Sequence, residues 1–211
     1  MFWVWYEVRM NDLKNQQRRK IYDARNGQID KDELSRLICS RFIAQPIYRQ
    51  AKTIMWYNHC RSEVRTRQAL SDELATGKRI VIPYCTKDEQ GHNKLGLWRL
   101  ESFVELIQGT WGILEPPKQR WGEPGKEVDP GELDCIMVPG VAFDRNGGRL
   151  GNGAGYYDRL LKNVRADAVL VGVCFESQLV EQVVADAHDV VMDYVMTEKT
   201  LYAGKGRQFS R

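Results

Sequence analysis

The sequence has few of the residues that build compact metal sites or disulfide frameworks. It contains five cysteines and three histidines, and no two cysteines have the CxxC spacing of a zinc site. An odd, scattered set of cysteines is typical of reduced thiols in a cytoplasmic protein. We therefore expect neither a histidine-based zinc site nor a disulfide-bonded secreted fold, and we predict a cytoplasmic location.

Long apolar runs are also lacking. No stretch approaches the roughly 20 apolar residues that cross a bilayer, and the mean hydropathy is −0.49. The aromatic opening, residues 1–10, is interrupted by Glu7 and Arg9 and has no cleavage site of a secretion signal. It could be a hydrophobic first strand, a packed arm or the product of a misplaced start codon. We expect a monomer without a membrane partner.

Charge is distributed unevenly along an otherwise ordinary globular composition, which is 43% hydrophobic and 28% charged. Residues 1–67 carry twice as many basic as acidic side chains, and the remainder is net acidic. A basic third of this kind can bind nucleic acid, hold phosphates, or form a solvated helix face. Because no DNA- or RNA-binding motif accompanies it, we expect no nucleic-acid partner.

The order of apolar and helical segments predicts an α/β fold. Residues 12–44 have the pattern of two helices, separated at Asn26-Gly27. Strand and helix patterns then alternate, which is typical of a parallel sheet. The predicted strands lie at 51–57, 78–84, 133–143, 168–175 and 190–196, and the predicted helices at 66–76, 155–163 and 180–187. The proline-rich residues 115–131 are expected to form a surface connection, and the tail 203–211 to be frayed.

The sharpest local pattern is RLGNGAGYYD at residues 149–158, between a predicted strand and a predicted helix. Its alternating glycines allow a ligand to approach the backbone, and the N–H groups of loop and helix can surround a phosphate. Arg149 suits a bidentate phosphate contact, and Asp158 could stabilise the helix dipole or bind Mg²⁺. The pattern matches neither the dinucleotide fingerprint nor the P-loop. These residues alone therefore leave an anion-binding loop and a tight structural turn both open.

The wider segment 134–159 resembles the signature of the 5-formyltetrahydrofolate cyclo-ligases, P-G-x-A-F-D-x-x-G-x-R-L-G-x-G-x-G-Y-Y-D. Weaker similarities extend over almost the whole chain, except residues 1–12. They include the basic helix with Lys14, Arg18 and Arg25, the E-[IV]-x-T pattern at Glu63, and the D-x-x-x-D-x-V-x-T pattern at residues 189–197. The resemblance implies one cyclo-ligase domain over residues 1–211, folded as a three-layer Rossmann-like sandwich of the NagB/RpiA/CoA-transferase type.

The resemblance also implies an activity and its residues. Such enzymes use ATP and Mg²⁺ to convert 5-formyltetrahydrofolate to 5,10-methenyltetrahydrofolate, with release of ADP and phosphate. The residues implied to bind ATP are Lys14, Arg18, Arg149, Leu150, Gly151, Asn152, Gly153, Ala154, Gly155, Tyr156 and Tyr157. Those implied to bind the folate are Asn58, Glu63, Asn152, Gly153, Ala154, Gly155 and Tyr156. Arg149 and Asp158 are implied to be catalytic, and Asp158 and Asp193 to hold the metal.

Several assignments depend on more than the resemblance. An aspartate in an apolar strand is costly unless it is paired or coordinated, which favours a functional Asp193. Trp56 could line the pocket. Trp111 could stack on the folate, although an exposed or core position is the alternative for this residue. One of the two tyrosines of the loop is expected to pack in the core.

Other functions compete with the cyclo-ligase activity. Asn152 and Ala154 replace basic residues that some family members carry, which keeps open a catalytically inactive nucleotide- or folate-binding module. A nucleic-acid binder or a phosphosugar isomerase or transferase on a related scaffold is a further alternative, because fold alone does not set function.

Overall fold

The computed structural model describes residues 2–186 and 189–207. The α-helices are α1 (Phe2–Gly27), α2 (Lys31–Ala44), α3 (Pro46–Gln50), α4 (Arg67–Leu74) and α5 (Tyr156–Leu161). The strands are β1 (Thr53–Met55), β2 (Arg79–Lys87), β3 (Asn93–Leu100), β4 (Ile107–Gln108), β5 (Leu114–Glu115), β6 (Cys135–Val138), β7 (Ala142–Asp144), β8 (Arg149–Leu150), β9 (Val169–Val173), β10 (Leu179–Val180), β11 (Tyr194–Met196) and β12 (Leu201–Ala203). Short 3-10 turns are η1 (Phe103–Glu105), η2 (Thr110–Gly112), η3 (Lys118–Arg120), η4 (Pro130–Glu132) and η5 (Glu176–Gln178).

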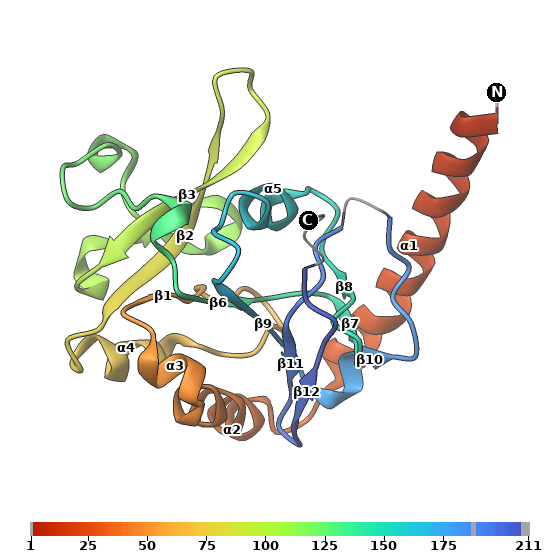
Figure 1. The fold of residues 1–211 in the computed structure, drawn as a ribbon, viewed down its shortest axis with the longest axis horizontal. Helices are drawn as coiled ribbons and strands as arrows, with labels where there is room; N and C mark the ends of the chain where they lie inside the picture. Colours follow the sequence, from red (N-terminus) through yellow and green to blue (C-terminus); the bar gives the residue numbers. More distant parts are fainter. Residues whose placement is uncertain (1, 187–188, 208–211) are drawn as a thin grey trace.

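A seven-stranded sheet forms the centre of the molecule, in the order β12-β11-β9-β6-β1-β2-β3 (Figure 1). Its five inner strands are parallel, and the edge strands β3 and β12 are antiparallel to their neighbours. This arrangement confirms the predicted α/β fold with a mostly parallel central sheet.

Successive residues of a strand point to opposite sides of the sheet. Helices cover both sides. On one face, Ile54 and Ile80 pack with apolar side chains of α2, α3 and α4, namely Ile38, Phe42, Tyr48 and Leu70. On the other face, Met55 and Val81 pack with Leu160 and Leu161 of α5. Ile38 and Phe42 are one helical turn apart, so both point from α2 into the same core. The helices above and below the sheet confirm the predicted three layers.

A smaller sheet, in the order β10-β7-β8, carries the glycine-rich loop. It packs against α1 through a third apolar cluster that contains Ile21, Leu150 and Val183. The N-terminal part of α1 projects beyond the body of the molecule (Figure 1). The small sheet and the inner part of α1 therefore bring the N-terminal basic residues to the glycine-rich loop.

Several predictions about local structure are wrong. The opening of the chain is helical from Phe2 onward rather than a strand. Residues 180–186 form no helix, and residue 187 lies outside the described residues. Val183 is buried against α1 and the small sheet. The apolar residues that suggested a helical face therefore pack in a segment that is not helical. In the tail, Gly204, Lys205 and Gly206 donate backbone hydrogen bonds to the body, whereas residues 208–211 lie outside the described part.

The strand predicted at 133–143 divides into β6 and β7, which lie in different sheets. The helix ends predicted at two glycines are confirmed. The two N-terminal helices separate at Gly27, and α4 is followed by Gly77 at φ 79°, a left-handed conformation that glycine tolerates. Among the described residues, no helix is long and apolar enough to cross a membrane.

Candidate functional site

A pocket of about 550 Å³ lies where α1, the small sheet and the ends of the central strands meet. This volume is in the range of small-molecule sites, roughly 300–1,000 Å³. All the residues predicted to bind ATP or the folate line it: Lys14, Arg18, Asn58, Glu63, Arg149, Leu150, Gly151, Asn152, Gly153, Ala154, Gly155, Tyr156 and Tyr157. The fold thus brings together segments that are up to about 140 residues apart in the sequence.

The glycine-rich loop forms one wall of the pocket. Gly153 and Gly155 have φ values of 94° and 68°, where a side chain would be strained. A Cβ added to Gly151 would lie 2.9 Å from Nη1 of Arg149. The glycines therefore serve both the backbone conformation and close approach to the arginine.

Arg149 is a buried cation with unused hydrogen-bonding capacity. Its Nη2 donates to Oδ1 of Asp158 at 2.5 Å, and its guanidinium lies 5.7 Å from the ring centre of Tyr157. Its Nε is buried and has no hydrogen-bond partner in the protein. A buried N–H without a partner is costly, so this atom is suited to an anionic group in the pocket.

Two carboxylates hold Lys14 at the pocket. Its Nζ lies 2.7 Å from Oδ2 of Asp186 and 2.7 Å from Oδ2 of Asp189. Burial lowers the pKa of Lys14, but the two aspartates outweigh this and raise it above the usual 10.5. Lys14 therefore stays protonated across the neutral range.

Two more basic residues of α1 point toward the pocket. Nε of Arg18 donates to the carbonyl of Gly151 at 2.9 Å, which places the guanidinium over the loop. Arg25 is buried, and its Nε donates to Oγ of Ser62 at 3.0 Å. The basic face of α1 is thus turned inward and is not the solvated charge run that was the alternative.

Glu63 and Asn58 also present hydrogen-bond acceptors to the pocket. Burial raises the pKa of Glu63 above 4.5, although the N–H of Cys60 and the charges of Arg25 and Arg61 counteract the shift. Nδ2 of Asn58 donates to the carbonyl of Leu114 at 2.8 Å, while its Oδ1 is buried without a partner. A ligand with N–H donors would satisfy both groups.

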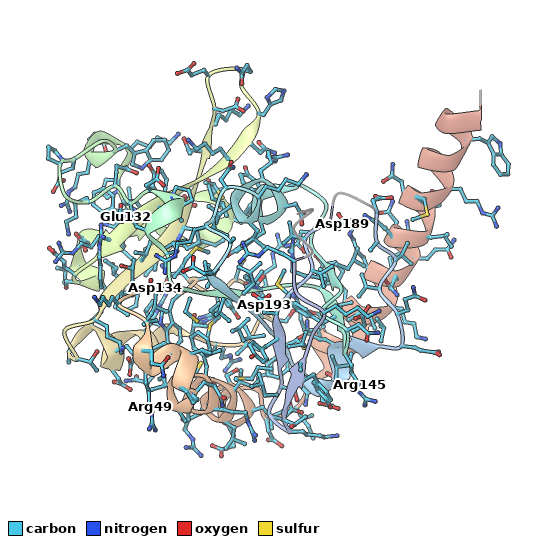
Figure 2. All side chains as sticks on the ribbon, in the orientation of Figure 1. Arg49, Glu132, Asp134, Arg145, Asp189 and Asp193 are labelled. Atoms are coloured by element: carbon cyan, nitrogen blue, oxygen red, sulfur yellow. The ribbon has the colours of Figure 1, made fainter. Side chains whose placement is uncertain are left out.

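The prediction that Asp193 shares a metal site with Asp158 is not supported by the geometry. Asp193 is not among the pocket residues, and its Oδ2 accepts the N–H of Leu170 at 2.8 Å. Figure 2 shows Asp193 beside β9, whereas Asp189 lies on the segment that faces α1. The hydrogen bond from the backbone of Leu170 pairs the carboxylate of Asp193. The cost of an aspartate in an apolar strand is therefore no evidence that Asp193 binds a metal.

Trp56 is likewise not in the pocket. It is fully buried and packs edge-on against Phe42 and Tyr48 in the core. Trp111 does line the pocket, and its ring meets Tyr156 edge-on with 6.0 Å between ring centres. Both loop tyrosines line the pocket and pack against the core at its rim.

The structure adds residues that were not predicted, notably Asp186, Asp189 and Glu115. Asp189 could have been found, because the D-x-x-x-D pattern contains both aspartates. Asp186 and Glu115 had no such signal, since their role depends on contacts with distant segments.

The residues fit a nucleotide with its metal ion. Among the described residues, no three His, Cys, Asp or Glu side chains form a group that could hold a metal alone. Mg²⁺, however, is usually held by one or two carboxylates together with phosphate oxygens. Asp158 and Asp189 line the same pocket as the loop and the unpartnered Nε of Arg149, which matches that requirement.

Comparisons with known proteins agree with this site. The model of the 5-formyltetrahydrofolate cyclo-ligase family matches residues 6–198 and so begins inside the segment 1–12. A 5-formyltetrahydrofolate cyclo-ligase of Mycolicibacterium smegmatis is 34% identical over 148 residues, 70% of this chain and 74% of that protein. A probable 5-formyltetrahydrofolate cyclo-ligase of Schizosaccharomyces pombe is 33% identical over 205 residues, 88% of this chain and 95% of the relative.

A solved structure has the same fold. The 5,10-methenyltetrahydrofolate synthetase of Aquifex aeolicus matches with a TM-score of 0.76 and 33% identity, covering 94% of this chain and 97% of that chain. Sequence, fold and pocket agree, and this chain belongs to the 5-formyltetrahydrofolate cyclo-ligase family.

Proposed function

We propose that this protein is a 5-formyltetrahydrofolate cyclo-ligase, which consumes ATP with Mg²⁺ and forms 5,10-methenyltetrahydrofolate, ADP and phosphate. The observation that carries the proposal is one pocket with two chemically different sets of groups. Lys14, Arg18 and Arg149 suit phosphate oxygens, while Glu63 and Asn58 suit the N–H donors of a pterin. A site for only one of the two ligands would not need both sets.

The phosphate-binding role is assigned to the loop and its arginine. The N–H groups of residues 151–155 and the unpartnered Nε of Arg149 would contact the triphosphate, and Lys14 and Arg18 would add charge from α1. Such fixed donors stabilise a phosphoryl group in transfer by position and charge, without a covalent step on the protein. This agrees with a pocket that needs no nucleophile–base pair.

The metal-binding role is assigned to Asp158 and Asp189. Each already lies beside a cation, Asp158 beside Arg149 and Asp189 beside Lys14. Asp158 and Asp189 would hold the metal, and Arg149 and Lys14 would contact phosphate oxygens. Mg²⁺ would supply positive charge that offsets the charge of the phosphates.

A basic side chain still lies against the loop although Asn152 and Ala154 are uncharged. Oδ1 of Asn152 accepts from the hydroxyl of Tyr22, and the carbonyl of Ala154 accepts from Nη2 of Arg159 at 2.6 Å. Arg159 lies against the loop and can compensate for the basic residues of other members. This supports the active enzyme over the inactive module.

The test is an absorbance assay for the methenyl product. Purified protein, 5-formyltetrahydrofolate and Mg²⁺ are mixed with and without ATP. Product that forms only when ATP is present would support the proposal, and Arg149→Met should abolish its formation. A folded protein that binds the folate but gives no product would favour the binding module.

A further inference from the structure

The segment of residues 109–115, here called the tryptophan strap, closes part of the pocket wall. Trp111, Ile113 and Glu115 of the strap line the pocket. The backbone of Trp111 is left-handed, with φ 56° and ψ 21°. The residue is 57% exposed, so burial of its ring does not explain this conformation. A bulky residue in this conformation is strained, and such strain persists only where the surrounding contacts enforce it.

Glu115 supplies two of the enforcing contacts. Its Oε1 accepts the N–H of Cys85 in β2 at 2.9 Å, and its Oε2 accepts the N–H of Thr110 at 3.0 Å. The side chain is buried, with 5% of its surface exposed. One carboxylate therefore ties the residue before Trp111 to the central sheet.

The strap is shaped around this carboxylate. A Cβ on Gly109 would overlap Oε2 of Glu115, so a larger residue at this position would displace it. The N–H of Gly109 donates to the carbonyl of Ile113 at 2.7 Å, and Asn58 donates to the carbonyl of Leu114. These contacts fix both ends of the strap and leave the Trp111 ring edge-on to Tyr156.

We propose that Glu115 is a positioning residue that holds Trp111 as a preformed aromatic wall for the reduced folate. The proposal rests on the proposed function, because it assigns the wall to the folate and not to ATP. A wall that is fixed before binding reduces the ordering cost that the ligand must meet. Loss of Glu115 should therefore weaken folate binding and leave the nucleotide contacts of Arg149 and Lys14 intact.

An amide cannot replace this carboxylate. Both oxygens of Glu115 accept a backbone N–H, whereas glutamine offers one acceptor and turns an NH₂ donor toward the other N–H. Glu115→Gln is nearly isosteric, so it breaks one of the two contacts with little change in packing. Thr110→Pro removes the N–H partner instead and is suited to the first position of the 3-10 turn.

A matched control is available outside the pocket. Glu105 also holds a loop through a half-buried carboxylate, because its Oε1 accepts the N–H groups of Glu101 and Ser102 and its Oε2 pairs with Lys126. Glu105→Gln should lower stability without reaching the folate. It separates a positioning effect from a general loss of stability.

The experiment measures steady-state kinetics and amide hydrogen exchange for the wild type and the three variants. We expect Glu115→Gln and Thr110→Pro to raise KM for the folate roughly tenfold, the effect of one lost hydrogen bond, with kcat and KM for ATP nearly unchanged. Exchange of the peptide that spans residues 107–115 should accelerate in these two variants and not in Glu105→Gln.

Two results would overturn the positioning role. One is an unchanged KM for the folate in a folded Glu115→Gln protein, and the other is a parallel rise of both KM values that Glu105→Gln reproduces. An active wild type with either result leaves the cyclo-ligase function in place. A wild type without ATP-dependent turnover would overturn the proposed function itself, and the assignment of the wall with it.

Discussion

Nζ of Lys14 lies 2.7 Å from Oδ2 of Asp189, although 175 residues separate them in the sequence. The contact joins α1 to the irregular segment that follows β10. Gln17 reinforces the junction, because it accepts the N–H of Val184 and donates to the carbonyl of Gln182. In the described structure, the cations suited to phosphate, Lys14 and Arg149, are thus paired with the carboxylates suited to a metal, Asp189 and Asp158.

Lys14→Gln should impair nucleotide binding. The change removes a cation from the pocket and leaves Asp186 and Asp189 close together without their shared counter-ion. We expect KM for ATP to rise roughly 10- to 100-fold, as for the loss of a charged hydrogen bond, while KM for the folate changes little. The exposed Lys20→Gln on the same helix is the control, and equal effects of both variants would contradict the assignment.

Asp189 and Asp193 should respond differently to substitution. Asp189→Asn should raise the Mg²⁺ concentration needed for half-maximal turnover, because a metal-binding carboxylate is weakened. Asp193→Ala should lower the melting temperature and leave the Mg²⁺ requirement unchanged, because it removes the acceptor of the Leu170 N–H. Turnover titrated with Mg²⁺, together with thermal unfolding, separates the two. A Mg²⁺ effect confined to Asp193→Ala would restore the assignment made from sequence.

Glu63→Gln should stabilise the fold and harm folate binding. Burial raises the pKa of Glu63 above 4.5, so the fold favours the protonated form. The stability that this group contributes is present below the unfolded value and is lost as pH rises through the raised pKa. At neutral pH the variant removes that penalty, so the melting temperature should rise, while KM for the folate should increase at least roughly tenfold.

The same carboxylate predicts the pH dependence of the wild type. If the ionised form of Glu63 binds the pterin donors, KM for the folate should rise as pH falls through the raised pKa. The rise should begin at higher pH than an ordinary carboxyl group would give. A flat KM in Glu63→Gln over the same pH range is the expected control.

Asp144→Ala should destabilise the protein strongly. The buried carboxylate accepts the N–H groups of Asn146 and Gly148 on Oδ1 and that of Val183 on Oδ2, all at 2.9 Å. It therefore joins the β7–β8 hairpin to the segment that carries Asp189. We expect a loss of about 2–5 kcal/mol in the free energy of unfolding in urea, because three backbone donors, that of Val183 in a buried hydrogen bond, lose their acceptor.

Asp144→Asn provides the comparison. Its remaining oxygen can still accept from Asn146 and Gly148, so the N–H of Val183 alone should lose its partner. The loss of stability should be clearly smaller than in Asp144→Ala. Equal losses would mean that the charge of Asp144, and not its number of acceptors, holds the junction.

The glycine-rich loop could be predicted because its requirements are local. Gly153 and Gly155 occupy left-handed backbone conformations, and residues of this kind are visible in the sequence. The family resemblance added Glu63 and the basic face of α1, and the pocket contains all of them. The prediction of a helix at 180–187 was wrong over residues 180–186 because Val183 packs against α1 and the small sheet. The spacing of the apolar residues in this segment resembles that of a helical face.

The sequence by itself determined the class of fold and the identity of the loop, because alternating apolar segments and glycine conformations act over short distances. Only the tertiary structure decided which aspartate faces the pocket, because Val183, Val184, Asp186 and Asp189 are placed by contacts with α1 and β7. It also decided the burial of Glu115, which the proline-rich composition placed on a surface connection. Its carboxylate is buried because the partners that satisfy it, Cys85 and Thr110, come from two separate segments.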